Sequence, residues 1–352
     1  MNLQDIARLR LASQQIAGTA FTSPRDLVAW MGAMQAQDYA MVKWAVGLRV
    51  AGATDLSVEE AIHRGEILRT HVMRPTWHLV AADDIYWMLE LTAPNIKKTM
   101  KSRRRELGLT ETVLSKSRKV LEKALRDGRH ATREELIPLL NKAGIPTTEN
   151  RASHIFVAAE LDGLICSGAV RSGKQTFGLL NERVPATPPL AREAALALLA
   201  ERYFTSHGPA TLEDFAWWSG LSAGDSKDAL ELTKPQLLSE VVEERIYWFA
   251  EWKIETKNTV FLLPAFDEFI ISYRDRRAVI TSENHKRAVS VNGMFHPTVV
   301  ANGEALGIWK RTMKKDTVKL VFEYFAQPND IIRRRVASAS LAYGRFLGTV
   351  VA

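Results

Sequence analysis

The chain has very little of what disulfide scaffolds, zinc sites and membrane proteins require. Its 352 residues include one cysteine, Cys166, which excludes an intramolecular disulfide and a cysteine-rich zinc site. No stretch approaches the roughly 18 consecutive apolar residues of a membrane span. The N-terminal segment also lacks the apolar region of a signal peptide. We therefore expect a cytoplasmic protein without membrane contacts.

The sequence also lacks the common motifs of hydrolytic enzymes. There is neither an H-E-x-x-H metal motif nor a G-x-S-x-G nucleophile elbow. Residues 168–175 nearly match a phosphate-binding loop, but Gln175 stands where Ser or Thr would bind magnesium, and the segment has the pattern of a hairpin. Cys166 begins an apolar strand and is predicted to lie in the core. We expect no metal and no organic cofactor.

What the chain does have is positive charge. Lys and Arg number 47 against 40 Asp and Glu, a net charge of +7. A basic excess favours anionic partners such as nucleic acid, although basic proteins without such a partner also exist. Some of the basic residues form four clusters, which are either phosphate contacts or solvated faces: 97–105, 274–277, 310–315 and 333–335.

A pattern of three helices followed by two strands recurs along the chain. The middle copy is the clearest, with helices expected over 112–127, 131–144 and 149–164 and a hairpin over 165–180. Thr132 and Glu135 form a capping box at the start of its second helix. Three helices and a hairpin with a basic tip are typical of a winged helix.

The other copies follow the same order less regularly. The third has helices expected over 191–208, 211–220 and 222–232 and strands over 237–251. The first has helices over 5–18, 23–37 and 57–69 and a strand pair over 69–80. Beyond residue 258 the pattern alternates like strands, with a hairpin at Asn302-Gly303 and a final helix near 329–343. The predicted fold is α+β, with three tandem winged-helix (helix-turn-helix) units over 1–95, 110–184 and 189–256 and a mainly β C-terminal subdomain over 258–352.

Two polar segments are candidates for chemistry. Gln35-Ala36-Gln37-Asp38 follows an apolar helix. Residues two apart point about 200° from each other on a helix but to the same side of an extended chain. The two glutamines therefore act as a pair only if the helix stops near Met34. The alternative is a helix end with two solvated glutamines.

The second segment is 69–78 (RTHVMRPTWH), in which Pro75 indicates an edge strand or a bulge. Alternation places His71 and Met73 on one face. The two histidines and two arginines beside Trp77 either line a cleft or form an edge whose polar groups are satisfied.

The sequence resembles the winged-helix DNA glycosylases of the AlkZ-like family, which is related to YcaQ. The resemblance is carried by the two polar segments above, by LLPAFDEFIISYRDR at 262–276 and by NGEALGIWKR at 302–311. The resemblance covers nearly the whole chain. It implies winged helices around a central basic channel that holds duplex DNA, and it makes Gln35 and Gln37 the catalytic pair of a Gln-Φ-Gln motif. The YcaQ-like branch has Gln-Φ-Asp instead, so Gln37 indicates the AlkZ-like branch. Asp38 has no assigned role.

The resemblance implies a monofunctional DNA N-glycosylase that acts in repair of alkylation damage, including bulky adducts or interstrand crosslinks. Glutamine is a poor general base, so we expect cationic N7-alkylated purines as substrates, acted on by a single subunit. The expected DNA-binding residues are Arg69, His71, Arg74, His78, Arg171, Lys174, Arg274, Arg276, Asn302, Lys310 and Arg311. The alternatives are a transcriptional regulator or other DNA-binding protein without catalysis, an RNA-binding or structural protein, and a resistance factor for a natural-product adduct.

Overall fold

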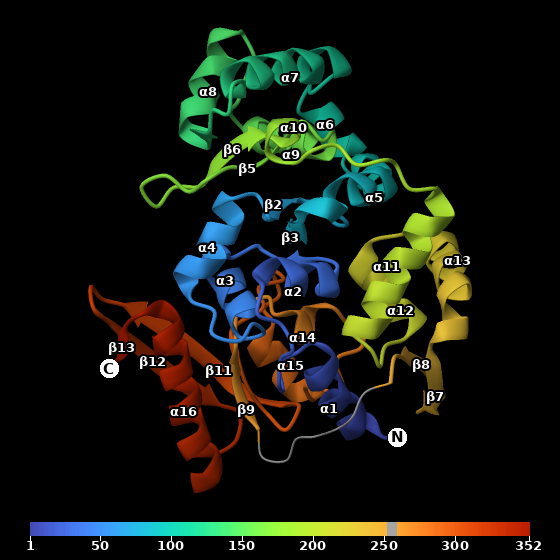
Figure 1. The fold of residues 1–352 in the computed structure, drawn as a ribbon, viewed down its shortest axis with the longest axis vertical. Coiled ribbons are helices and arrows are strands. Elements are labelled where there is room, and N and C mark those ends of the chain that lie inside the picture. The colour runs from blue at the N-terminus through green and yellow to red at the C-terminus, as the bar shows by residue number, and fades with distance from the viewer. Residues whose placement is uncertain (252–258) are drawn as a thin grey trace.

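The computed structural model describes residues 1–251 and 259–352 and has a mixed α+β fold (Figure 1). Its three helix-and-hairpin segments are followed by a C-terminal sheet. None of the described helices is long and apolar enough to cross a membrane. The predicted boundary between the third unit and the C-terminal part, at residues 256–258, lies outside the described residues.

The middle segment has the predicted elements. Its helices pack around a core that includes Leu121, Leu136 and Phe156. Both hydrogen bonds of the capping box between Thr132 and Glu135 are present. The elements are α7 (Glu111–Leu125), β4 (Ala131–Thr132), α8 (Arg133–Lys142), α9 (Arg151–Leu161), β5 (Ile165–Ser167), β6 (Thr176–Leu179) and α10 (Leu180–Arg183). The strands form a sheet in the order β4-β6-β5.

The third segment is also built as predicted. The residues before it, 185–191, form neither helix nor strand. Buried aromatic residues hold its helices together, among them Tyr203, Phe215 and Trp218. The elements are α11 (Arg192–Ser206), α12 (Leu212–Ser219), α13 (Ala223–Thr233), η2 (Lys234–Gln236) and the hairpin of β7 (Leu238–Val242) and β8 (Arg245–Phe249).

The first segment differs from the prediction. The helix expected over 23–37 ends at Met31, because Gly32 caps it with φ 74°. An unpredicted helix follows, and α1 packs against the C-terminal part of the chain, where Ala7 and Leu11 meet Phe269. The elements are α1 (Leu3–Ser13), α2 (Pro24–Met31), β1 (Met34–Gln35), α3 (Tyr39–Gly47), α4 (Asp55–His63), β2 (Ile67–His71) and β3 (Trp77–Ala81).

The residues that connect the first and middle segments are largely helical. The 3-10 turn η1 (Ala82–Asp84) leads into α5 (Ile85–Thr99), and α6 (Lys101–Glu106) follows directly. Trp87 and Met88 of α5 are buried in the same core as Leu199 of α11. Helix α5 also packs against α9, so it joins all three segments.

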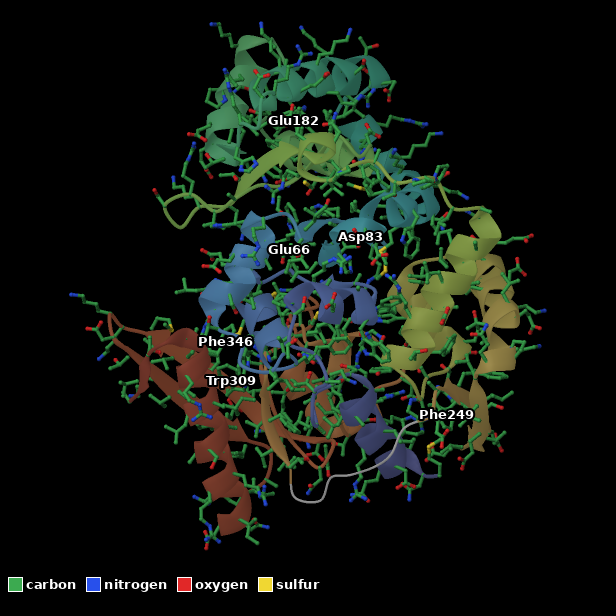
Figure 2. The ribbon with its side chains drawn as sticks, viewed as in Figure 1. Glu66, Asp83, Glu182, Phe249, Trp309 and Phe346 are labelled. Carbon is green, nitrogen blue, oxygen red and sulfur yellow. The ribbon has the colours of Figure 1, made fainter. Side chains whose placement is uncertain are left out.

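The C-terminal part is a five-stranded sheet in the order β13-β12-β11-β10-β9. The turn at Asn302-Gly303 is confirmed between β10 and β11. The strands are β9 (Val260–Leu263), β10 (Thr298–Ala301), β11 (Glu304–Met313), β12 (Thr317–Tyr324) and β13 (Val350–Val351). Helix α16 (Asp330–Leu347) contacts both edge strands, so the sheet curls around it. Figure 2 shows Trp309 and Phe346 where this sheet and helix meet the first segment.

The prediction of strand from residue 258 to 280 is wrong beyond Leu263. Pro264 follows the strand, and Asp267 then caps the short helix α14 (Glu268–Ile271) by accepting a hydrogen bond from the backbone of Phe269. A second helix, α15 (Ser282–Ala288), comes before β10. The apolar residues at 269–271 are buried on every side, and alternation cannot distinguish such a run from a strand.

Candidate functional site

The segment Gln35–Gln37 lies in extended or irregular structure. Strand β1 pairs antiparallel with β3, so that Gln35 lies opposite His78. The backbone N–H of Ala36 donates to the carbonyl of Trp77 at 2.7 Å, and a bend follows at Gln37. The helix therefore stops before Met34, which is the condition under which the two glutamines can act together.

The two glutamines have different surroundings. Gln35 is 5% exposed. Its side-chain Oε1 accepts a hydrogen bond from the hydroxyl of Thr76 at 3.2 Å, and its backbone N–H donates to Glu268. Gln37 is exposed, and its side chain has no hydrogen-bond partner among the described residues. One amide is thus fixed in place, and the other is free to contact a ligand or water.

Glu268 is the buried anion beneath this strand, and it was not predicted. Its carboxylate accepts hydrogen bonds from the backbone of Gln35, from Trp218 Nε1 at 3.2 Å and from the hydroxyl of Ser272. Burial alone would raise its pKa, but His207, whose Nε2 lies 3.5 Å from Oε2, and the hydrogen bonds from Ser272 and the backbone of Gln35 lower the pKa to about 2. The signal in the sequence was a pair of acids, Asp267-Glu268, inside an apolar run.

Arg69 holds the Gln35–Gln37 segment to its neighbours. Its Nε donates to the carbonyl of Ala36 at 2.9 Å, and Nη1 donates to the side chain of Gln175. The guanidinium lies 4.1 Å from the ring centroid of Trp77. Burial lowers the pKa of Arg69 to about 10. With these contacts and an exposed fraction of 8%, Arg69 supports the segment from within the protein.

Both predicted histidines are buried. His71 Nδ1 lies 2.7 Å from Glu160 Oε2, and its ring packs on Trp77. His78 is 0% exposed, and its Nδ1 donates to the carbonyl of Thr76 at 2.9 Å. Burial lowers the pKa of His78 to about 3, so this ring is neutral at pH 7. His71 therefore fits the alternative in which the polar groups of this segment form hydrogen bonds within the protein. His78 fits it only in part, because its Nε2 has no partner among the described residues.

Arg74 lies in the turn between β2 and β3. The turn begins at Met73, which has φ 65°, and Pro75 is part of it rather than of a bulge in the ladder. Arg74 Nε and Nη2 are buried and have no hydrogen-bond partner in the described parts of the chain. Burial lowers the pKa of Arg74. The turn thus carries a guanidinium that is largely removed from water.

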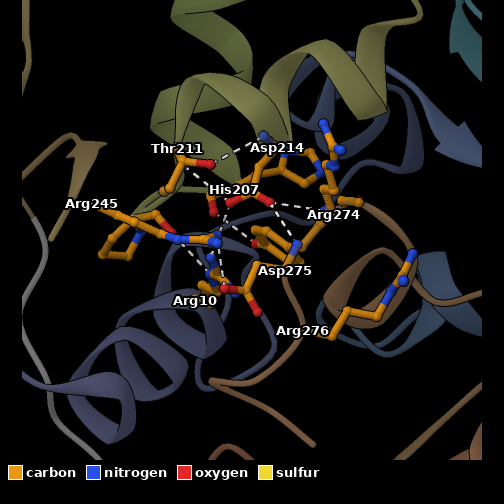
Figure 3. Close-up of polar contacts among 12 residues, drawn as sticks. Arg10, His207, Thr211, Asp214, Arg245, Arg274, Asp275 and Arg276 are labelled. Carbon is orange, nitrogen blue, oxygen red and sulfur yellow. Dashed lines mark hydrogen bonds and ion pairs between the residues drawn. The ribbon is translucent and has the colours of Figure 1, made fainter. Parts of the chain in front are cut away.

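Arg274 and Arg276 follow α14. The backbone N–H of Arg274 donates to Asp214 at 2.8 Å, and its side chain is exposed. Asp214 also accepts from the backbone of Asp275 and lies 3.7 Å from Arg10. Figure 3 shows these contacts, with Arg276 turned away from them. The segment after α14 is therefore anchored through its backbone, which leaves the side chain of Arg274 accessible.

The remaining predicted DNA contacts lie on hairpins. Arg171 and Lys174 form the exposed tip between β5 and β6, where Arg171 pairs with Glu135. Asn302 accepts a hydrogen bond from the backbone of Thr259 at 3.0 Å.

The turn that contains Asn302 packs against α1: a Cβ on Gly303 would lie 2.8 Å from Ala7 Cβ. Lys310 is exposed further along β11, and Arg311 donates to the hydroxyl of Tyr343. Six residues of strand, roughly 20 Å, separate Glu304 from Lys310, so this turn and these two cations do not form one cluster.

Other expectations concern Asp38, Cys166 and metals. The side chain of Asp38 caps α3 by accepting from the backbone of Met41 at 3.0 Å, which gives this residue a structural role. Cys166 is buried as predicted, and burial raises its pKa to about 12. The described residues contain no group of three or more His, Cys, Asp or Glu that could hold a metal ion.

A pocket of about 290 Å³ opens beside Arg69 and Trp77, between the first and middle segments.

Comparison with known proteins identifies the family. The model of the family "DNA glycosylase AlkZ-like" matches residues 28–346. An interstrand DNA cross-link repair glycosylase of Streptomyces sahachiroi is 26% identical over 320 residues, which are 86% of this chain and 85% of that protein. The solved structure of the S. sahachiroi DNA glycosylase AlkZ has the same fold, with a TM-score of 0.83 and 20% identity over 100% of this chain and 99% of the other. The chain therefore belongs to the AlkZ-like DNA glycosylase family.

Proposed function

We propose that this protein is a monofunctional DNA glycosylase that hydrolyses the N-glycosidic bond of cationic N7-alkylated purines in duplex DNA. The observation that carries the proposal is the pair of amides on the segment after α2. Gln35 is fixed by Thr76 and Glu268, and Gln37 has no partner among the described residues. Membership of the glycosylase family supports the assignment.

The chemistry needs little from the enzyme. A purine alkylated at N7 is positively charged, so it takes the electron pair of the N-glycosidic bond and leaves as a neutral base. Water attacks C1′, and its proton passes to solvent. An amide oxygen accepts a hydrogen bond from that water, and an amide nitrogen donates one. Gln37 orients the water and Gln35 orients the sugar, and positioning of this kind can lower the barrier substantially.

The buried carboxylate of Glu268 adds to this effect. Positive charge grows on the sugar as the glycosidic bond breaks, and a fixed negative charge in a low-dielectric site favours that change. Glu268 is 1% exposed, and its low pKa keeps it ionised at neutral pH. It acts through the strand that it holds and through its charge, without touching the substrate.

The fold suits a duplex. We interpret the three helix-and-hairpin segments as winged helices, over 1–95, 110–184 and 189–256, around a channel bordered by the β subdomain of 258–352. In Figure 1 the β5–β6 hairpin and the β11–β12 hairpin project to the same side of the molecule. Lys174 and Lys310 are exposed on these hairpins. Cations on separate segments can contact phosphates spread along a duplex, whereas they are too far apart to bind one small anion together.

The lesion is proposed to include bulky adducts. The S. sahachiroi relative is named as an interstrand cross-link repair glycosylase. The pocket beside Trp77 is next to the segment that carries the glutamines, since Ala36 pairs with the backbone of Trp77. The pocket provides room for a bulky substituent on an alkylated base while that base remains in the duplex. We expect one subunit to be sufficient.

Base release tests the proposal. The substrate is a duplex that contains N7-methylguanine, and the comparison is a Gln35→Ala, Gln37→Ala double variant. We expect release by the native protein and a loss of about 10²-fold or more in the variant. If the native protein binds duplex DNA but releases no base from this duplex or from one with a bulky N7 adduct, the protein is a DNA-binding protein without this activity.

A further inference from the structure

Two arginines flank the outer end of α12, next to the segment that carries the glutamines. The stem of Arg74 packs on Gly220, the residue that ends α12: a Cβ built there would lie 3.2 Å from Arg74 Cγ. The guanidinium of Arg276 lies 5.5 Å from the ring centroid of Trp217, three residues earlier. Trp217 and its neighbour Trp218 lie on different faces of α12: Trp218 is fully buried, whereas Trp217 is 44% exposed.

The guanidinium of Arg74 is desolvated and makes no hydrogen bond with any described residue. Two of its nitrogens, Nε and Nη2, are buried, and its side chain has no hydrogen bond or ion pair with any described residue. A guanidinium removed from water is costly unless an anion or hydrogen-bond acceptors replace the water. The negative charge of Glu268 offsets only part of this cost and supplies no hydrogen bond, so Arg74 remains costly here, which indicates a ligand that supplies the missing acceptors.

Arg276 is in a similar position. Its Nε donates to the carbonyl of Ile270 at 2.9 Å, but Nη2 is buried without a partner in the described parts of the chain. Burial lowers the pKa of Arg276 to about 10, and the nearby positive charge of Arg74 acts in the same direction. Two cations that repel each other in the free protein attract one anion jointly.

We propose that Arg74 and Arg276 bind a single phosphate of the DNA backbone, with the exposed ring of Trp217 as the apolar wall of the site. This inference rests on the proposed function. The planar fork of arginine matches the oxygens of a phosphate in two parallel hydrogen bonds. The site lies beside the catalytic segment, since Thr76, two residues after Arg74, donates to Gln35. A phosphate held here fixes the damaged strand against the glutamines.

The first test measures binding of undamaged duplex DNA by Arg74→Met and Arg276→Met between 50 and 200 mM salt. Methionine keeps an unbranched apolar stem and removes the charge. We expect at least tenfold weaker binding at 100 mM salt and a slope of log K against log salt that is smaller by about 0.9 in magnitude, the value for one phosphate. Because the phosphate is held only when both arginines are present, either single variant releases it, and the double variant loses the same 0.9 and not twice that. The control is Arg192→Met, an exposed arginine that pairs with Asp225.

The second test measures thermal unfolding of the free protein. Arg74→Met removes an unpaired charge, so we expect a higher melting temperature than that of the native protein, together with weaker DNA binding. A purely structural arginine would give the opposite change in melting temperature. Inorganic phosphate at 10 mM is then added to both proteins, to distinguish a free anion from the DNA backbone.

A lower melting temperature of Arg74→Met would contradict the proposal, and three further results overturn it. The first is that Arg74→Met binds duplex DNA as tightly as the native protein does, with the same slope of log K against log salt. The second is a slope in the double variant that is smaller by the value for two phosphates, which would mean that each arginine contacts a phosphate of its own. The third is stabilisation by inorganic phosphate that depends on Arg74 while duplex binding does not. If the native protein fails to bind duplex DNA at all, the proposed function fails together with this inference, which distinguishes that case from the first three.

Discussion

Replacing Glu268 with glutamine tests how strongly this carboxylate stabilises the Gln35–Gln37 segment. The substitution keeps the shape of the side chain but removes its charge and turns one acceptor into a donor. The carboxylate receives donors on both oxygens, from Gln35 on one side and from Trp218 and Ser272 on the other. An amide leaves at least one of these buried donors facing another donor. We expect Glu268→Gln to be strongly destabilising.

The pKa of Glu268 sets the magnitude and the pH dependence. A pKa of about 2 in the folded protein, against an ordinary value of 4.5, corresponds to about 3 kcal/mol of stability. For a carboxyl whose pKa is lowered by folding, this contribution is complete above about pH 4.5 and is lost as the pH falls toward 2. The difference in unfolding free energy between the native protein and Glu268→Gln should therefore be about 3 kcal/mol at pH 7 and about half of that at pH 3.

Urea unfolding at pH 7 and pH 3 measures this difference, and Glu283→Gln, at an exposed position on α15, is the control. Single-turnover base release completes the test. The rate at saturating DNA should fall in Glu268→Gln, while the affinity for duplex DNA should change little. Equal stability of the two proteins at pH 7, or a difference that does not depend on pH, would refute the reasoning.

Three more predictions follow from the same surroundings. Asp38→Ala removes the cap of α3 and should lower the unfolding free energy by about 1 kcal/mol in urea titrations, whereas Asp38→Asn should retain most of it. His78 is buried with a pKa of about 3, below its unfolded value, so the native protein should lose stability as the pH falls from about 6.5 toward 3. The slope in this range should be smaller by about 1.4 kcal/mol per pH unit in His78→Gln, and an unchanged slope would contradict a neutral buried ring. Arg69→Lys cannot contact Ala36, Gln175 and the Trp77 ring together, so base release should fall at least tenfold, and native rates in this variant would show that Arg69 does not support the segment.

Local signals in the sequence predicted much of the fold. The middle and third segments carry caps and glycine stops that agree with their apolar periodicity, and their helices lie where expected. The capping box at Thr132 is an example in which a four-residue pattern placed a helix start correctly. The turn at Asn302-Gly303 was equally clear, because Asn-Gly favours a hairpin turn with positive φ at both residues. The φ angles in the structure are 52° and 92°.

Tertiary contacts decided what the sequence left open. The end of α2 depends on Gly32, which packs against Trp218 from a helix almost 190 residues later. The short helix α14 depends on Asp267, whose partner Arg49 comes from the first segment. Periodicity reports neither contact, so α2 was predicted too long and α14 was predicted as a strand.

The candidate site shows the same division. The glutamines were found as a motif, but Glu268 came only from the structure, and Arg69 was expected to contact DNA and not to support the segment. Glu268 lies more than 230 positions from Gln35, and Arg69 acts through Ala36. The unpartnered state of Arg74 likewise depends on burial, which a basic residue in a sequence does not reveal.

The most direct test of the central claim compares a cationic and a neutral base in the same duplex. Single-turnover release of N7-methylguanine and of uracil is measured for the native protein, Gln35→Ala and Gln37→Ala. We predict release of N7-methylguanine alone by the native protein, and a loss of about 10²-fold or more in each variant with duplex affinity retained. Release of uracil at a comparable rate, or native rates in both glutamine variants, would contradict the proposal that two amides hydrolyse a bond already weakened by the charge of the base.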